Sequence, residues 1–277
     1  MFKAIVLLFA VALASAELPT VWLEGQQPEN APKIIKGEDA NDGEFPYILS
    51  LRRKGVTPGH FCGASILTSN WVLTAAHCCA SIKNKAEFYA YAGSVLLNQG
   101  GSEHFVQDLY PHESYQPGQN WKNDICLIKV IQPFKFTDKV QQVALAPKGT
   151  VVNSGDKVTI AGWGYTSPNG NSQADIPNRL QKGVDFIALS ERECEMVSGL
   201  KMFPGYLCAR GKFNGQCTWN GDSGGPLTRQ GAQVGLTSFG FRPYGGGKPT
   251  VYARVTNYID WIKQKLGPDA SQLKFKQ

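Results

Sequence analysis

One hexapeptide of this 277-residue chain has the composition expected around an activated serine. Gly221-Asp222-Ser223-Gly224-Gly225-Pro226 surrounds Ser223 with glycines. A serine hydroxyl is a weak nucleophile, so it needs exposure on a tight turn, an adjacent base and backbone N–H donors aimed at the developing oxyanion. Glycines allow that turn and the close approach of a substrate carbonyl. A Gly-rich surface turn is the alternative explanation, and two partners elsewhere in the chain argue against it.

A base and an orienting carboxylate for Ser223 occur earlier in the chain. His77 lies in Thr74-Ala75-Ala76-His77-Cys78, where a disulfide would hold the histidine's loop still. Asp124 opens an apolar run, and a carboxylate is the right group to fix the tautomer of His77 and to stabilise its imidazolium. The order His77, Asp124, Ser223 is one of the known orders of a Ser-His-Asp triad. The remaining histidines are interpreted as ordinary surface or core residues: His60, His104 and His112.

Short β-strands separated by turns must position these residues. Charged residues make up only 18% of the chain and glycine is frequent, which favours many short strands. Runs rich in β-branched or aromatic residues predict the following strands: Trp71–Thr74, Phe88–Tyr91, 125–131, 157–160, 184–188 and 234–239. A helical period occurs only at the end of the chain, in the apolar residues Tyr258, Trp261, Ile262 and Leu266. The predicted fold class is all-β, closed by one C-terminal α-helix.

The N-terminal segment predicts secretion. Lys3, the apolar stretch Ala4–Leu13 and the small residues 14–16 have the order of a signal peptide over residues 1–16. The apolar stretch is about half as long as a membrane-spanning helix, so no membrane anchor is expected. Residues 17–33 contain three prolines and read either as a disordered arm or as an activation pro-peptide. A secreted, oxidised chain should pair most of its seven cysteines and leave one over.

Composition and motifs argue against several other functions. The net charge of +6 is spread along the chain without a Lys/Arg run, so no nucleic-acid partner is expected. No His-x-x-x-His or Cys-x-x-Cys pattern occurs, so no zinc site is expected. Neither a metal nor any other cofactor is predicted.

With all these motifs in view, the sequence resembles the chymotrypsin-like (trypsin/elastase) serine endopeptidases. The resemblance begins at Ile34-Ile35-Lys36-Gly37, includes Gly162-Trp163-Gly164 and the strand 251–255, and ends with the terminal helix. It implies a protease domain over residues 34–277. That domain would consist of two antiparallel β-barrels of about equal size, with the active site in the cleft between them. His77 and Asp124 would belong to the first barrel and Ser223 to the second.

The resemblance also implies a mechanism. Ser223 attacks the scissile carbonyl, His77 passes the proton to the leaving amine, and Asp124 stabilises the charged imidazole. The backbone N–H groups of Gly221 and Ser223 form the oxyanion hole. Ser238-Phe239-Gly240 binds the substrate backbone as an added strand.

Activation by proteolysis follows from the same resemblance. A trypsin-like protease would cut after Lys33 and release a new α-amino group on Ile34. That ammonium would be buried beside Asp222 and order the oxyanion hole. Because a buried, unpaired carboxylate costs several kcal/mol, the free amine would act as a switch.

Two cysteine pairs match family disulfides: Cys62 with Cys78, and Cys194 with Cys208. A third family bridge cannot form, because Trp219 occupies one of its positions. Cys79, Cys126 and Cys217 remain. Cys79 and Cys126 follow closely after His77 and Asp124, and two small buried thiols are favoured over a disulfide between them. The family's calcium loop is also lost, since Ser94-Val95-Leu96-Leu97 contains no acidic ligand.

The pocket expected to hold the P1 side chain, the residue before the scissile bond, lacks an aspartate at its floor. The expected substrate-binding residues are Cys217, Thr218, Ser238, Phe239, Gly240 and Thr250. The floor is Cys217 if no gap is assumed, or Gly215 with a two-residue insertion. Neither can offset the charge of a Lys or Arg side chain, so basic P1 residues should be rejected. Gly240 leaves one wall open and Thr250 shortens the pocket, so an apolar P1 residue is expected.

The sequence therefore predicts a secreted, monomeric serine endopeptidase made as a zymogen, chymotrypsin- or elastase-like and digestive. Its partners would be protein and peptide substrates, an activating trypsin-like protease and protein inhibitors. One alternative is a non-catalytic relative that binds partners, which would usually lack a triad residue. Another is a regulatory cascade protease, which would usually carry extra modules.

Overall fold

The computed structural model describes residues 37–118, 121–166, 175–212, 216–241 and 247–277. The expected signal peptide, the pro-peptide, Ile34 and Gly215 lie outside these residues. Among the described residues, no helix is long and apolar enough to cross a membrane.

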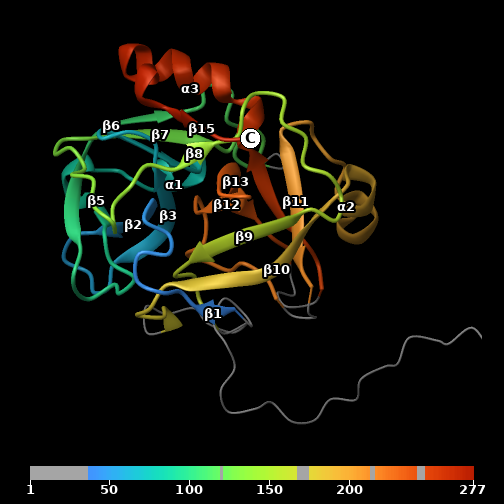
Figure 1. The fold of residues 1–277 in the computed structure, drawn as a ribbon, viewed down its shortest axis with the longest axis horizontal. Helices are drawn as coiled ribbons and strands as arrows, with labels where there is room; N and C mark the ends of the chain where they lie inside the picture. The colour runs from blue at the N-terminus through green and yellow to red at the C-terminus, as the bar shows by residue number, and fades with distance from the viewer. Residues whose placement is uncertain (1–36, 119–120, 167–174, 213–215, 242–246) are drawn as a thin grey trace, which may run out of the picture. The chain divides into compact units, whose positions relative to one another are not determined.

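The first half of the described chain closes into a six-stranded barrel, in the order β2-β3-β4-β7-β6-β5 (Figure 1). Its strands are β2 Ile48–Arg53, β3 His60–Ile66, β4 Trp71–Thr74, β5 Phe88–Ala92, β6 Ser102–Pro111 and β7 Cys126–Val130. All neighbours are antiparallel. The predicted strands in this half are confirmed, and the first of them, Trp71–Thr74, has the predicted bounds.

The second half forms another closed antiparallel barrel, in the order β12-β9-β10-β11-β14-β13 with β13 pairing back to β12. Its strands are β9 Lys157–Gly162, β10 Gln181–Leu189, β11 Tyr206–Gly211, β12 Pro226–Arg229, β13 Ala232–Phe239 and β14 Thr250–Arg254. Three two-residue strands extend this sheet: β1 Glu38–Asp39 on β10, and β8 Ala144–Leu145 and β15 Lys274–Phe275 beyond β13. The prediction of two antiparallel barrels is confirmed.

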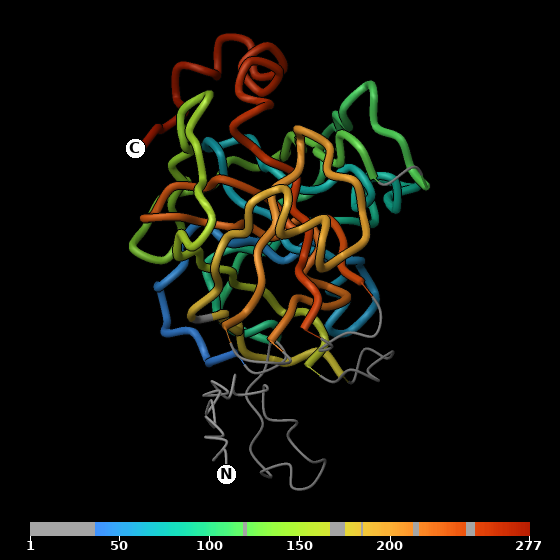
Figure 2. The backbone as a smooth tube through the Cα atoms, turned by 90° about the vertical axis from the view of Figure 1, so that its right-hand side faces the viewer, coloured from blue at the N-terminus to red at the C-terminus, as the bar shows by residue number. Residues whose placement is uncertain are grey.

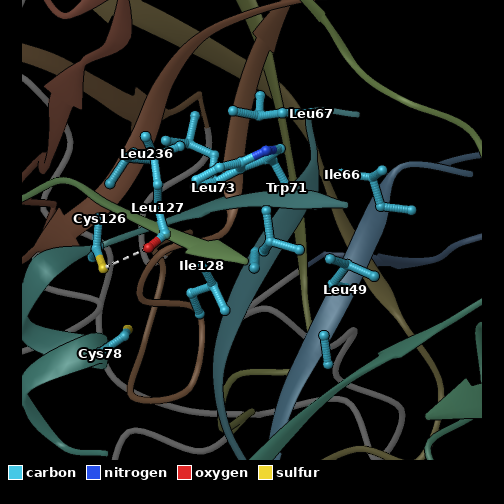
Figure 3. Packing of buried hydrophobic residues seen from close by; sticks show 14 of the residues in the cluster. Leu49, Ile66, Leu67, Trp71, Leu73, Cys78, Cys126, Leu127, Ile128 and Leu236 are labelled. Atoms are coloured by element: carbon cyan, nitrogen blue, oxygen red, sulfur yellow. Dashed lines mark hydrogen bonds between the residues drawn. The ribbon is translucent and has the colours of Figure 1, made fainter. Parts of the chain in front are cut away.

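The main apolar core fills the first barrel and reaches the second. Figure 3 shows Trp71, Leu73 and Leu127 of the first barrel beside Leu236, which lies on β13. These side chains are fully or almost fully buried. Burial of one such leucine stabilises the fold by about 1.5–3 kcal/mol, so this shared cluster holds the two barrels together as well as filling one of them.

Besides the predicted C-terminal helix, the described residues form two further α-helices that the apolar patterns in the sequence do not indicate. They are α1 Ala76–Ala80 and α2 Glu191–Ser198. Helix α2 begins with a capping box, in which Ser190 accepts a bond from the Glu193 backbone and the Glu193 side chain accepts one from the Ser190 backbone. The Ser-x-x-Glu spacing of this box is a sequence signal for a helix start. The described part of the chain also contains three 3₁₀ helices: η1 Lys85–Glu87, η3 Val255–Asn257 and η4 Gly267–Gln272.

The predicted C-terminal helix is present as α3 Ile259–Leu266. Ile259, Ile262 and Leu266 are buried and belong to the main core cluster. Figures 1 and 2 both show the red C-terminal helix at the top of the view. The Trp71 indole donates to Asp269 at 2.8 Å, which fixes the segment after α3 against the first barrel.

Candidate active site

His77 and Asp124 form the most closely defined part of the site. The His77 backbone N–H donates to Asp124 Oδ1 at 2.9 Å, and Nδ1 of its ring lies 2.8 Å from Oδ2. Asp124 also accepts a bond of 2.5 Å from the Ser238 hydroxyl and is only 1% exposed. Because an ionised carboxylate only accepts hydrogen bonds, the proton of the His77 ring lies on Nδ1. Nε2 is then free to act as a base.

Local backbone structure places both residues. The β4–β7 pairing sets Thr74 opposite Cys126, so α1 begins beside the turn that carries Asp124. Asn123 precedes Asp124 with a positive φ of 56°, a conformation that asparagine tolerates better than most residues. The Asn123 side chain donates to the Ser114 carbonyl and accepts from Tyr258. These bonds hold the turn.

The loop that carries Ser223 is anchored to both barrels. Gly63 of β3 donates to the Ser223 carbonyl at 2.8 Å, and the Gly224 N–H donates to Thr237 of β13 at 2.7 Å. Gly224 has a φ of +77°, and a Cβ atom there would lie 2.1 Å from the Thr74 hydroxyl. The glycine predicted to shape this turn is therefore required by the packing as well as by the backbone.

Asp222 is buried beneath the same loop. Its carboxylate accepts bonds of 2.9 Å from the backbone N–H groups of Trp219 and Gly164. Gly162 and Gly164 leave room for it, since a Cβ atom on either would come within 2.4 Å of the carboxylate. Burial raises the pKa of Asp222 to about 6, against the two backbone bonds, which lower it. The charged form is thus disfavoured without a buried cation.

His60 is a site residue that the sequence patterns do not indicate. The expectation of an ordinary surface or core residue does not foresee this contact, in which Nε2 lies 3.0 Å from the Gly221 carbonyl, in the loop that carries Ser223. Nδ1 of the same ring lies 2.8 Å from the Ser50 hydroxyl. Burial, together with the charge of Arg52, lowers the pKa of His60 to about 3. No spacing rule in the sequence connects β3 with this loop.

The other two histidines have local partners. His104 contacts the Ser102 hydroxyl and the Gln132 carbonyl. His112 packs between Tyr258 and Trp261. For these two, the expectation of ordinary structural residues is consistent with the contacts.

A cavity of about 340 Å³ brings the candidate site together. Its lining residues are His77, Trp121, Thr218, Trp219, Asn220, Ser223, Thr237, Ser238, Phe239 and Gly240. Six residues expected from sequence are among them: His77, Thr218, Ser223, Ser238, Phe239 and Gly240. Trp121 is a further lining residue without a sequence signal, and its ring meets that of His77 edge-on at 5.3 Å. It forms a large apolar wall beside the His77 ring.

Cys217 and Thr250 differ from the expectation that they line the pocket. Both are buried, and neither is among the described lining residues. Thr250 instead contacts Thr218, which does line the cavity, because their hydroxyls share a hydrogen bond of 2.8 Å. Trp219 occupies the place of the lost disulfide and packs with Cys217 against Tyr165. Among the described lining residues there is no carboxylate.

Three disulfides are present. Cys62–Cys78 and Cys194–Cys208 pair as the resemblance implied. Cys79 pairs with Cys126, so the preferred interpretation of two buried thiols is wrong. Cys217 is the seventh cysteine and stands outside these bridges. Cys62, His77 and Cys78 lie close enough to share a metal ion, but disulfide sulfurs are not the thiolates that bind metals.

Comparisons with known proteins agree with this geometry. The Trypsin family model matches residues 34–262. Chymotrypsin-2 of Vespa crabro is 38% identical over 83% of this chain and 99% of its own length. Chymotrypsin-C of Bos taurus is 33% identical, covering 87% of this chain and 91% of its own. Trypsin Blo t 3 of Blomia tropicalis is also 33% identical, over 93% and 92%.

A solved structure gives the same result for the fold. Neuropsin, a serine protease expressed in the limbic system of mouse brain, superposes with a TM-score of 0.73 at 31% identity. The match covers 83% of this chain and 99% of neuropsin. The family model spans both barrels and the candidate site, and the relatives are covered almost end to end. The chain belongs to the trypsin family of serine proteases.

Proposed function

We propose that this protein is a secreted endopeptidase, made as a zymogen, in which Ser223 is the nucleophile, His77 the base and Asp124 the residue that orients the base. The observation that carries the proposal is that His77, which is hydrogen-bonded to Asp124, lines the same cavity as Ser223. Membership of the trypsin family supports the same assignment.

The chemistry follows from the bonds around the pair. Nδ1 of His77 is committed to Asp124, so Nε2 takes the Ser223 proton as the hydroxyl attacks a peptide carbonyl. The resulting imidazolium is stabilised by Asp124, which is buried and receives further bonds from the His77 backbone and from Ser238. His77 then returns the proton to the leaving amine. Water next attacks the acyl-enzyme by the same steps and releases Ser223.

The oxyanion hole consists of the backbone N–H groups of Gly221 and Ser223. Gly221 has a φ of +99°, which turns its peptide into a conformation that glycine adopts without strain. Each such donor in a protease contributes about 3–4 kcal/mol to the stabilisation of the transition state. The anchoring of the Ser223 and Gly221 carbonyls by the first barrel supports this role.

The substrate is a protein or peptide with an apolar P1 residue. Strand β13 ends at Phe239, and Ser238, Phe239 and Gly240 line the cavity where a substrate strand would be added. The absence of a carboxylate among the described lining residues argues against a basic P1 side chain. The hydrogen-bonded Thr218–Thr250 pair supports a short pocket of the elastase kind.

Activation by cleavage after Lys33 is part of the proposal. The buried Asp222 carboxylate, with its pKa raised to about 6, would be stabilised by the new Ile34 ammonium. The predicted signal peptide, residues 1–16, supports secretion. Similarity to two chymotrypsins supports a digestive role, while neuropsin has the same fold and is expressed in brain, so proteolysis rather than digestion is the core of the proposal.

The test is active-site labelling of the trypsin-treated protein. Wild type should react with a serine-directed phosphonate and hydrolyse a peptide with an apolar P1 residue. Ser223→Ala should lose the label and at least about 10⁴-fold in kcat, because the triad acts as a unit. Ser271→Ala, which changes an exposed serine in η4 that is not among the residues lining the cavity, is the matched control. Hydrolysis by Ser223→Ala at the rate of the control would refute the proposal.

A further inference from the structure

We propose that buried Arg52 is a positioning residue for the oxyanion-hole glycine, Gly221, acting through a hydrogen-bond chain that crosses from the first barrel to the second. The catalytic consequence rests on the proposed endopeptidase function, while the hydrogen-bond chain itself can be tested without it.

The hydrogen-bond chain has a single consistent direction from donor to acceptor. Arg52 Nε donates to the Ser50 hydroxyl at 3.1 Å, Ser50 meets His60 Nδ1 at 2.8 Å, and His60 Nε2 meets the Gly221 carbonyl at 3.0 Å. A carbonyl can only accept, so His60 Nε2 carries the ring proton. Nδ1 of the neutral ring must then accept from Ser50. The guanidinium donates to the Ser50 oxygen, which leaves the Ser50 proton to point at His60.

Burial of the positively charged Arg52 side chain at this position is energetically unfavourable. It is 5% exposed, its guanidinium carbon lies 3.6 Å from the centre of the Tyr91 ring, and its Nη2 has no hydrogen-bond partner among the described residues. Glu103 and the Tyr89 hydroxyl lie near enough to favour its charge, but it forms no ion pair within the described part of the chain. A buried cation of this kind is poor support for stability, so a positioning role explains it better.

His60 is kept neutral by its surroundings. The ring is fully buried, packs edge-on against Trp163, and faces the positive charge of Arg52. Both burial and that charge disfavour protonation. The remaining titratable groups around this hydrogen-bond chain are Tyr89 and Tyr91 of β5, Glu103 of β6, and Asp222, which follows Gly221. A protonated His60 would turn Nδ1–H towards Ser50, whose proton would then lose its acceptor.

The last link of the hydrogen-bond chain, from His60 to Gly221, controls the position of one oxyanion donor. Gly221 has no side chain to hold it, and only its carbonyl is fixed from the first barrel. The neighbouring donor, Ser223, is fixed separately by the Gly63 N–H. If His60 turned or became protonated, Gly221 could rotate and its N–H would leave the oxyanion position, while Ser223 would stay in place.

The experiment compares Arg52→Met with Arg53→Met, the exposed neighbour on the same strand. Proteins labelled with ¹⁵N-histidine are titrated by NMR between pH 4 and 8. In wild type and Arg53→Met, His60 should remain in the Nε2–H form above pH 5. In Arg52→Met its pKa should rise by at least one unit. Peptide hydrolysis by Arg52→Met should show about tenfold lower kcat with little change in KM, and the loss should deepen as the pH falls.

The NMR measurement is repeated in the Ser223→Ala background, so it does not depend on catalysis. Absence of proteolysis in all variants would refute the proposed function while leaving the His60 result intact. Identical His60 spectra and kcat in Arg52→Met and Arg53→Met would overturn the positioning role. Should Arg52→Met fail to fold, Ser50→Ala breaks the same chain while keeping the guanidinium, and an unchanged kcat in that variant would overturn the proposal.

Discussion

Cys79 and Cys126 form a disulfide that joins the helix carrying His77 to the strand that follows Asp124. Each cysteine lies two positions after the candidate triad residue. The bridge therefore links the segment that carries His77 to the segment that carries Asp124. The His77–Asp124 bonds themselves run through other atoms, so the bridge supports the pair without making it.

Removing this bridge should affect stability more than chemistry. The Cys79→Ala/Cys126→Ala variant frees a loop of 47 residues, and on the chain-entropy model this costs about 4 kcal/mol in the free energy of unfolding. Removal of Cys194–Cys208, which closes only 14 residues, should cost about 3 kcal/mol. Guanidinium denaturation measures both. Because the His77–Asp124 bonds remain, kcat should fall less than tenfold, and a collapse of kcat in a folded variant would contradict this.

Gly224 should tolerate no side chain. In Gly224→Ala the methyl group would meet the Thr74 hydroxyl and the Gly63 carbonyl at a positive φ of 77°. We expect a loss of about 2–4 kcal/mol in the free energy of unfolding together with lower kcat, because the displaced backbone carries Ser223. Gly199→Ala is the control, since its φ is +72° but no atom lies within 4 Å of the added carbon. Its cost should be only about 1 kcal/mol. Equal losses in urea denaturation would show that packing at Gly224 is unimportant.

Asp222 should make the stability of the uncleaved precursor depend on pH. A carboxyl whose pKa is raised from 3.8 to about 6 binds more protons when folded, so the precursor loses stability as the pH rises through this window. The two-unit difference corresponds to about 3 kcal/mol. Lys33→Gln keeps the precursor uncut, and its free energy of unfolding between pH 4 and 7 reports the loss.

Two comparisons isolate this effect. Asp222→Asn in the same precursor should lack the pH-dependent loss. In the cleaved enzyme, the Ile34 ammonium should offset the buried charge until the pH rises through the raised pKa of that amine, above its ordinary value of about 8. Full activity of uncut Lys33→Gln after trypsin treatment would contradict activation at this bond.

The barrels could be predicted from sequence because they rest on local patterns, and the candidate triad residues could be named because they lie in motifs. Strand β4 has its predicted bounds since four apolar or β-branched residues are buried together. Helix α2 could have been predicted from Ser190 and Glu193, whose capping spacing is local. The Cys79–Cys126 bridge could not, because it depends on the register that sets Thr74 opposite Cys126.

The residues that contact Gly221 could not be predicted from the sequence for a similar reason. Arg52 and His60 lie on neighbouring strands and reach Gly221 only once the barrels have packed. Alternation along β2 gives no hint that an arginine is buried there. Trp121 likewise meets His77 through a loop conformation with positive φ, which residue type does not indicate.

Specificity should be decided by the hydrogen-bonded Thr218–Thr250 pair. Kinetics with matched substrates carrying Lys, Phe, Leu and Ala at P1 should show the lowest kcat/KM for Lys, because no carboxylate among the described lining residues can pair with it. Leu and Ala should be preferred over Phe, since each methylene that does not fit costs about 1–3 kcal/mol. Thr250→Gly removes the partner of Thr218 and should raise kcat/KM for Phe relative to Ala about tenfold. Thr137→Gly, at an exposed position in the first half of the chain, should leave this ratio unchanged. A preference for Lys would refute the apolar pocket, whereas a strong Phe preference in the wild type would show that Thr250 does not shorten it.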